Sequence, residues 1–111
     1  MTDERTKKVA RNQAMYRQVN ERIEELNEAF DEMSGEFVVV CECADPMCAE
    51  QIALSREAYE RTRANSAQFI LRPGHQAADI EDLVATEGDY VIVEKHAGEP
   101  ASLAQKTDAR H

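Results

Sequence analysis

Three cysteines within one short segment are the residues of this sequence best suited to chemistry. They are Cys41, Cys43 and Cys48, in the string CECADPMC. Residues two apart on a β-strand point to the same side, so a strand that runs to Cys43 would bring the first two thiols together. A turn at Asp45-Pro46 would then return Cys48 toward them. Thiolates gathered in this way are typical zinc ligands.

A zinc site of this kind needs a fourth ligand. His75 is the first choice, because it follows a predicted strand on the stiff, tightly bent Pro73-Gly74 turn. His96 and the carboxylate of Asp45 are the alternatives. Four protein ligands leave no open position for water, which indicates a structural zinc ion. An iron–sulfur cluster fits the segment less well, because four cysteines usually hold one.

The charge of the chain argues against a nucleic-acid partner. Its 111 residues carry a net charge of −9, of which residues 1–22 hold +3 and the remainder −12. The length allows one compact domain with an appendage. An acidic body repels phosphate backbones, so we expect no nucleic-acid partner.

The cellular compartment can be predicted from the N-terminal residues, the length of the apolar runs and the cysteines. The start, MTDERTKK, lacks the apolar core of a signal peptide. No apolar run approaches the roughly 18 residues that cross a bilayer, so we expect no membrane association. The sequence therefore predicts a cytoplasmic protein, where thiols stay reduced. Three reduced cysteines favour metal binding over a disulfide framework.

The elements that position these residues follow from periodicity and turn signals. A long helix is expected over 3–33 and is closed by Gly35. A short helix over 56–64 has Ser55 as its N-cap. The segment 80–86 fits either a helix or a strand. Strands are expected over the apolar, β-branched segments 37–41, 51–54, 68–71 and 90–94.

These elements make the predicted fold class α+β. It consists of a long N-terminal helix and a small, mostly antiparallel sheet with one short helix, stapled by zinc. We assign residues 1–35 to the helix, as a possible helix-pairing arm, and 36–95 to a zinc-binding α+β domain. Residues 96–111, rich in small and polar residues, are expected to form a flexible tail.

The long helix carries a coiled-coil pattern. Two series of apolar residues, each spaced by seven, interleave along it: Val9, Tyr16, Ile23 and Phe30, and Val19, Leu26 and Met33. A helix of about 45 Å would overhang a domain about 25–30 Å across. We therefore expect a protein partner to contact Val9, Tyr16, Val19, Ile23 and Leu26. The alternative is that Tyr16, Ile23, Leu26 and Phe30 cover the protein's own sheet.

The charges of the helix suggest the kind of partner. Its first half is basic and its second half is acidic. An antiparallel pair of copies would set each basic half against an acidic half. The sequence therefore predicts an antiparallel homodimer, or docking onto a helix of another protein.

Residues 11–95 resemble a widespread family of short actinobacterial proteins. The family pattern is a Cys-x-Cys-x4-Cys knuckle, a helix with a tyrosine and a Pro-Gly-His turn. The matching residues are Cys41, Cys43, Cys48, Tyr59, Pro73, Gly74 and His75. The resemblance implies the zinc site with His75 as a ligand, and it implies no activity.

Catalytic motifs are missing from the sequence. It has no deaminase signature, no P-loop, no Gly-x-Gly-x-x-Gly and no nucleophile elbow. The prediction is therefore a non-enzymatic zinc-binding module for protein–protein interaction or regulation, similar to a zinc finger. The alternative is a redox- or zinc-responsive regulator, because oxidation of zinc-bound thiolates releases the metal.

Overall fold

The residues that the structure describes form an α+β fold of three helices and five strands. The computed structural model describes residues 4–30, 36–43, 45 and 47–108, and the side chains of 27–30 fall outside this description. The predicted α+β fold class is confirmed. Met33 and the predicted helix end at Gly35 lie outside the described residues. The elements in chain order are α1 (Glu4–Phe30), β1 (Glu36–Val40), β2 (Gln51–Ser55), α2 (Arg56–Arg63), β3 (Gln68–Leu71), β4 (Glu81–Thr86), β5 (Val91–Lys95) and α3 (Glu99–Lys106).

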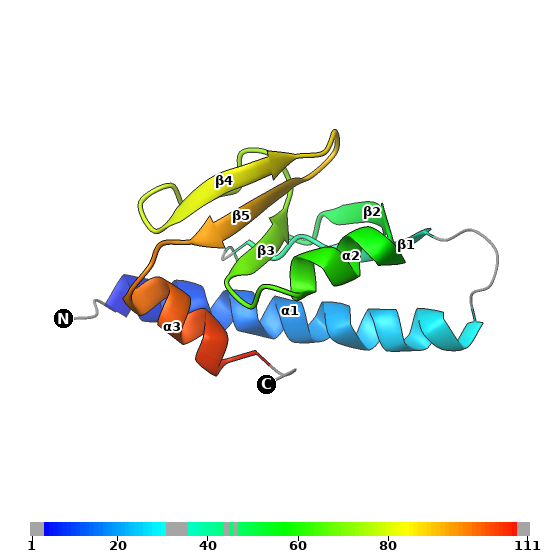
Figure 1. Cartoon of the computed structure of the whole chain (residues 1–111), viewed down its shortest axis with the longest axis horizontal. Helices are drawn as coiled ribbons and strands as arrows, with labels where there is room; N and C mark the ends of the chain where they lie inside the picture. The colour runs from blue at the N-terminus through cyan, green and yellow to red at the C-terminus, as the bar shows by residue number, and fades with distance from the viewer. Residues whose placement is uncertain (1–3, 31–35, 44, 46, 109–111) are drawn as a thin grey trace.

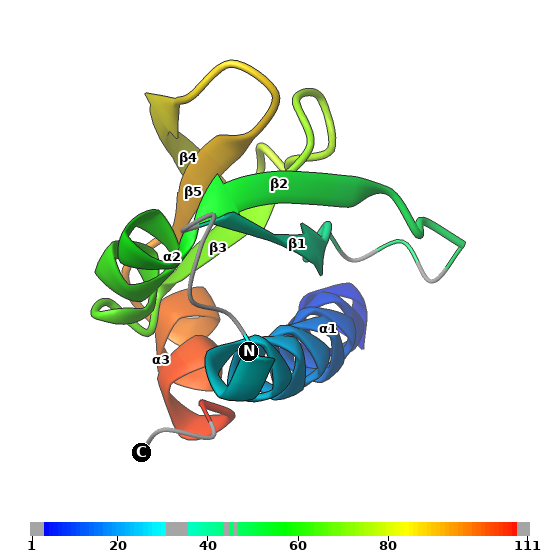
Figure 2. The ribbon, with the colours of Figure 1, turned by 90° about the vertical axis from the view of Figure 1, so that its right-hand side faces the viewer.

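Two antiparallel sheets form the body of the protein. β1 and β2 make a hairpin, and the second sheet has the strand order β3-β5-β4. The ambiguous segment 80–86 is the strand β4, with an irregularity between Leu83 and Ala85. Where β1 ends, Glu42 N donates to Ile70 O at 2.9 Å, so the hairpin extension runs beside β3. Figure 2 shows the hairpin and the three-stranded sheet above α1.

The apolar core lies between these sheets and the helices. Val39, Tyr59, Ile70 and Val93 are fully buried in it. The predicted N-cap is confirmed, because the Ser55 hydroxyl accepts the N–H of Ala58 at 3.0 Å and starts α2. With the helix beginning at this residue, Tyr59 lies on the side of α2 that faces the core.

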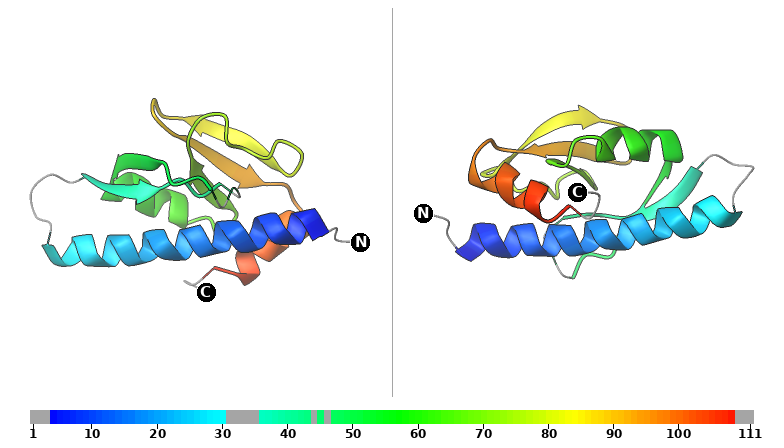
Figure 3. Two further views of the ribbon diagram at one scale, coloured as in Figure 1. Left: turned by 180° about the vertical axis from the view of Figure 1, so that it is seen from behind. Right: turned by 60° about the horizontal axis from the view of Figure 1, so that its bottom comes forward.

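The helix α1 runs along the long axis of the molecule, which measures 48 × 28 × 24 Å (Figures 1 and 3). At about 1.5 Å per residue, its 27 residues span about 40 Å. The helix packs on β1 and α3. Over residues 4–26, whose side chains the structure describes, the fully buried positions of this helix are mostly polar, with two apolar members. The buried residues are Thr6, Val9, Gln13, Ala14, Arg17 and Asn20.

The two heptad series of α1 therefore do not form one continuous seam. Val9 is buried in the chain's own fold and Ile23 packs against its core, while Tyr16 is half-buried. Val19 and Leu26 stay 42% and 51% exposed. The hydrogen bonds of the polar inward face decide which side of the helix turns to the body, and they split the predicted partner residues between two faces.

The predicted flexible tail is wrong over residues 99–108. These residues include α3, with Ala104 and Asp108 buried. The Arg17 guanidinium donates to Ala104 O at 2.8 Å, and Arg63 Nη2 lies 2.5 Å from Asp108 Oδ1. Two buried arginines from distant parts of the sequence thus hold α3 against the body. Residues 109–111 lie outside the described part of the chain.

Candidate metal centre

The three cysteines and His75 converge on one point. Their ligand atoms all lie within 4.8 Å of one another. His75 Nδ1 is 3.6 Å from Cys41 Sγ and 3.6 Å from Cys48 Sγ. A tetrahedral zinc ion, with sulfur at about 2.3 Å and nitrogen at about 2.0–2.1 Å, holds sulfur and nitrogen about 3.5–3.6 Å apart. The residues therefore fit a bound metal ion, and their chemistry is consistent with zinc.

The backbone after β1 places the first two thiols. Cys41 N donates to Glu50 O at 2.9 Å, which continues the β1–β2 pairing one step beyond the strands. Glu42 N donates to Ile70 O on the other side. This extended path puts Cys41 and Cys43 on the same face, as the Cys-x-Cys spacing predicts.

An Asx turn places the third thiol. The Asp45 side chain accepts the N–H of Met47 at 2.9 Å, and Asp45 O accepts the N–H of Cys48 at 3.0 Å. Asp45 therefore shapes the turn that returns Cys48. Among the described residues, neither Asp45 nor His96 belongs to the cluster. His96 instead contacts Asp82, at 3.1 Å between Nε2 and Oδ1.

A glycine turn places His75. Its N–H donates to Arg72 O at 3.1 Å, and the intervening Gly74 has φ +88°. This left-handed conformation is strained for residues with a Cβ, which explains the glycine before the histidine.

Glu50 orients the imidazole, a role that the sequence patterns do not indicate. Its Oε2 lies 3.2 Å from His75 Nε2, so that ring nitrogen faces a carboxylate while Nδ1 faces the sulfurs. Glu50 Oε1 lies 3.3 Å from Arg72 Nε, and Arg72 N donates to Cys41 Sγ at 3.2 Å. A carboxylate behind a histidine is a recurring partner of metal ligands, because it fixes the ring and the tautomer.

Burial keeps the inner thiols protonated unless a cation is present. It raises the pKa of Cys41 and also that of Cys43. A divalent ion supplies the positive charge that stabilises the thiolates in this environment. Three thiolates, one neutral imidazole and a divalent ion give a formal charge of −1, and the Arg72 guanidinium near Glu50 lies close to this site.

An asparagine on α1 connects the helix to the segment that holds the ligands. Asn20 Nδ2 donates to Val40 O at 2.8 Å, and Asn20 Oδ1 accepts the N–H of Val40 at 2.8 Å. The same Nδ2 contacts Glu42 Oε2 at 2.7 Å, and Glu42 Oε1 accepts the N–H of Ile70. Asn20 and Glu42 are both buried, and burial raises the pKa of Glu42. Glu42 thus binds both α1 and β3.

Comparisons with known proteins leave the interpretation to the chain's own residues. Among the described residues, no helix is both long and apolar enough to cross a membrane. Searches of family models, curated proteins and solved structures give no match to this chain. The resemblance to the actinobacterial family therefore stays a prediction. The residues themselves establish a small α+β fold with a Cys3His cluster that can hold a metal ion.

Proposed function

We propose that this chain is a cytoplasmic, non-enzymatic protein-interaction module whose fold is held by one zinc ion. Cys41, Cys43, Cys48 and His75 are the zinc ligands. The observation that carries the proposal is the convergence of these four donors, with two sulfur–nitrogen distances of 3.6 Å that match tetrahedral zinc.

A structural role for the metal follows from what the ligands connect. They come from the end of β1, from the turn before β2 and from the turn after β3. Zinc at this point would tie the hairpin to the three-stranded sheet. Small domains bury a limited share of their surface, so a metal contributes much of their folding free energy. Four protein ligands fill the tetrahedral shell and leave no position for a reacting water.

An interaction role is supported by the outer face of α1. Met15, Val19 and Leu26 are 42–51% exposed on this helix although each is a large apolar residue. Apolar side chains at helical spacing on a solvent face are typical of protein contact sites. The closed metal shell supports the same non-catalytic interpretation.

A redox- or zinc-responsive regulator is the second candidate, and the exposure of Cys48 favours it. Cys41 and Cys43 are buried, whereas Cys48 is half-buried beside Met47, which is 87% exposed. Peroxide would reach the Cys48 thiolate first and oxidise it to a sulfenic acid, and the peroxide would be reduced to water. The loss of this ligand would weaken the hold on zinc.

Metal analysis of the purified protein tests the ligand set. We expect one zinc ion per chain, and substoichiometric zinc in Cys48→Ser and in His75→Ala. His96→Ala is the matched control and should keep its zinc, because His96 lies outside the cluster. Full zinc occupancy in both ligand variants would refute the assignment.

Two further measurements test the roles. If zinc stays bound during treatment with mild peroxide, the hypothesis of a redox-responsive regulator is refuted. A pull-down from the native host with zinc-loaded protein tests the interaction role, and Leu26→Glu serves as the variant that should lose its partner.

A further inference from the structure

The outer edge of β2 carries backbone groups that have no partner among the described residues. Cys41 N donates to Glu50 O, and hydrogen-bonded pairs alternate along an antiparallel ladder, so positions 52 and 54 of β2 also face β1. The N–H and C=O groups of Gln51 and Ala53 therefore point away from β1. Both residues are exposed, and neither has a further hydrogen bond within the described part of the chain. Such a row of donors and acceptors fits an added, extended strand.

The outer edge of the three-stranded sheet is protected against such pairing. The strand β4 at this edge pairs with β5. Its ladder is irregular between Leu83 and Ala85, and its Glu81 carboxylate is buried beside Lys95 Nζ at 2.8 Å. Bulges and inward-pointing charges are devices that keep edge strands from joining other chains. The strand β2 has a regular register with β1 and contains neither a charged residue nor a proline. Its edge is therefore the one suited to a further strand.

The sequence of β2 can pair with itself in an antiparallel register centred on Ala53. Residues directly opposite each other in a symmetric antiparallel pair must point to the same face, and this register meets that condition. Ala53 lies opposite Ala53 of the second copy, and Gln51 lies opposite Ser55. The buried residues Ile52 and Leu54 then lie opposite each other on the core-facing side. No like charges are opposed along the strand, so side chains and backbone both permit the pairing.

We propose that a second copy of this chain pairs with the outer edge of β2, with a two-fold axis at Ala53. The hairpins of the two copies then form one four-stranded antiparallel sheet in the order β1-β2-β2-β1. The contact is isologous, so each backbone hydrogen bond between the copies has a symmetric counterpart. The area buried by one strand places this contact among the small, weak interfaces.

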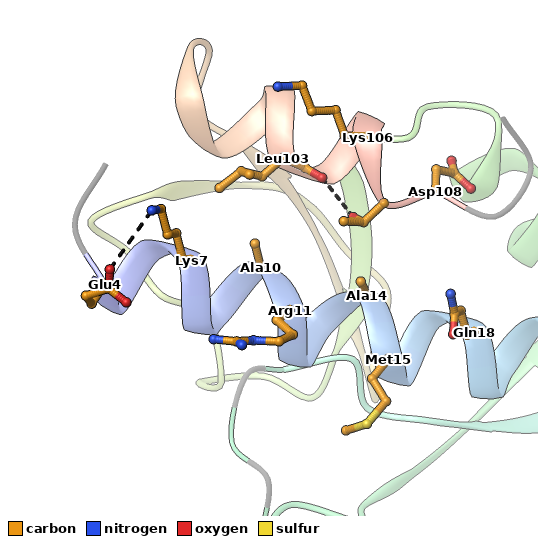
Figure 4. Close-up of a pocket in the computed structure, with 11 residues that line it drawn as sticks. Glu4, Lys7, Ala10, Arg11, Ala14, Met15, Gln18, Leu103, Lys106 and Asp108 are labelled. Carbon is orange, nitrogen blue, oxygen red and sulfur yellow. Dashed lines mark hydrogen bonds and ion pairs between the residues drawn. The ribbon is translucent and has the colours of Figure 1, made fainter. Parts of the chain in front are cut away.

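This contact leaves the surfaces of α1 uncovered. Asn20 on α1 bonds Val40 on the side of β1 opposite to β2, and Figure 2 shows β1 between β2 and α1. A groove of about 850 Å³ lies between α1 and α3. Figure 4 shows Ala10 and Ala14 directed from α1 toward α3, whereas Met15 points away. Dimerisation through β2 therefore goes beyond the proposed interaction role of α1 and is compatible with it.

Charge substitutions at Ala53 test the register in zinc-loaded, full-length protein. At a two-fold axis a residue meets its own copy, so Ala53→Lys and Ala53→Asp each place like charges together. Sedimentation equilibrium up to about 500 µM covers the affinity of a small interface. We expect wild-type dimers and a dimer dissociation constant raised by more than about tenfold in either variant. An equimolar mixture of the two variants should recover a heterodimer, because each charge then meets its opposite.

Two further measurements separate this interface from general effects. Val84→Lys adds the same charge to the edge strand β4, where Val84 is 49% exposed, and should dimerise like the wild type. Exchange of the Gln51 and Ala53 amide hydrogens should slow in the wild type as its concentration rises into the dimer range. A wild-type chain that carries one zinc ion and stays monomeric overturns the homodimer while leaving the metal centre intact. Dimers that persist in both Ala53 variants, a mixture that stays monomeric, or amide exchange that ignores concentration also overturn it.

Discussion

Replacement of Asn20 by leucine tests how α1 is held against the metal-binding segment. Leucine keeps the branched shape of asparagine but is larger, and it removes both polar atoms. Three hydrogen bonds disappear, two to Val40 at 2.8 Å and one to Glu42 at 2.7 Å. The Val40 N–H, the Val40 carbonyl and one Glu42 oxygen are left without that partner in a buried setting.

The size of the effect follows from these groups. An unsatisfied buried polar group costs about 1–3 kcal/mol, with more for a charged one. Three such groups sum to several kcal/mol, and the apolar leucine side chain offsets about 1–2 kcal/mol by its burial. We expect Asn20→Leu to lower the free energy of unfolding by about 3–5 kcal/mol, a large part of the roughly 5–15 kcal/mol typical of folded domains.

Urea unfolding of zinc-saturated protein, followed by circular dichroism, measures this difference. Gln18→Leu is the matched control, because it makes a similar change on the exposed side of the same helix. The control should change the free energy of unfolding by less than about 0.5 kcal/mol. If Asn20→Leu lowers the free energy of unfolding by less than about 1 kcal/mol, water or local relaxation replaces these hydrogen bonds. That result would refute the role of Asn20 in holding α1 against the metal-binding segment.

Three other predictions concern the surroundings of the metal centre and the attachment of α3. Glu50→Ala should weaken zinc binding by about 10–100-fold in chelator competition, because the His75 ring loses its carboxylate; exposed Glu57→Ala should leave the affinity unchanged. Gly74→Ala should destabilise the zinc-loaded protein by about 1–2 kcal/mol in thermal unfolding, because φ +88° is strained for alanine; an unchanged midpoint would contradict this. Asp108→Ala should destabilise the protein by about 3–5 kcal/mol and speed hydrogen exchange in α3, because it removes one partner of a buried guanidinium; unchanged exchange would contradict this.

The inward face of α1 explains why its apolar pattern was a poor guide to its packing. Arg17 lies over the Phe69 ring, 4.4 Å from its centre, and its guanidinium binds the backbone at Ser66 and Ala104. Burial lowers the pKa of Arg17, which reflects the low polarity around it. A buried guanidinium with backbone acceptors decides the helix orientation more strongly than one valine or leucine, because unpaired burial of the charge would cost far more.

Much of the fold and of the metal centre could be predicted from the sequence, because local rules set these parts. The alternation of side chains along a strand places Cys41 and Cys43 together. Ser55 caps α2, and the Pro-Gly-His turn presents His75. The short β-branched runs Val38–Val40 and Val91–Val93 lie in the strands β1 and β5. Each of these signals acts over a few residues, so the chain order alone reveals it.

Tertiary structure alone decided the parts that depend on pairing between distant residues. Glu50 behind His75, Asn20 on Val40, and Arg63 on Asp108 join positions 20 to 45 residues apart. No periodicity marks these side chains, because their role arises only when folding excludes water and brings their polar groups within hydrogen-bonding distance. The spacing of the three cysteines was therefore enough to predict a metal-binding cluster from the sequence. The residues that orient His75 and attach α1 and α3 to the body could be identified only from the tertiary structure.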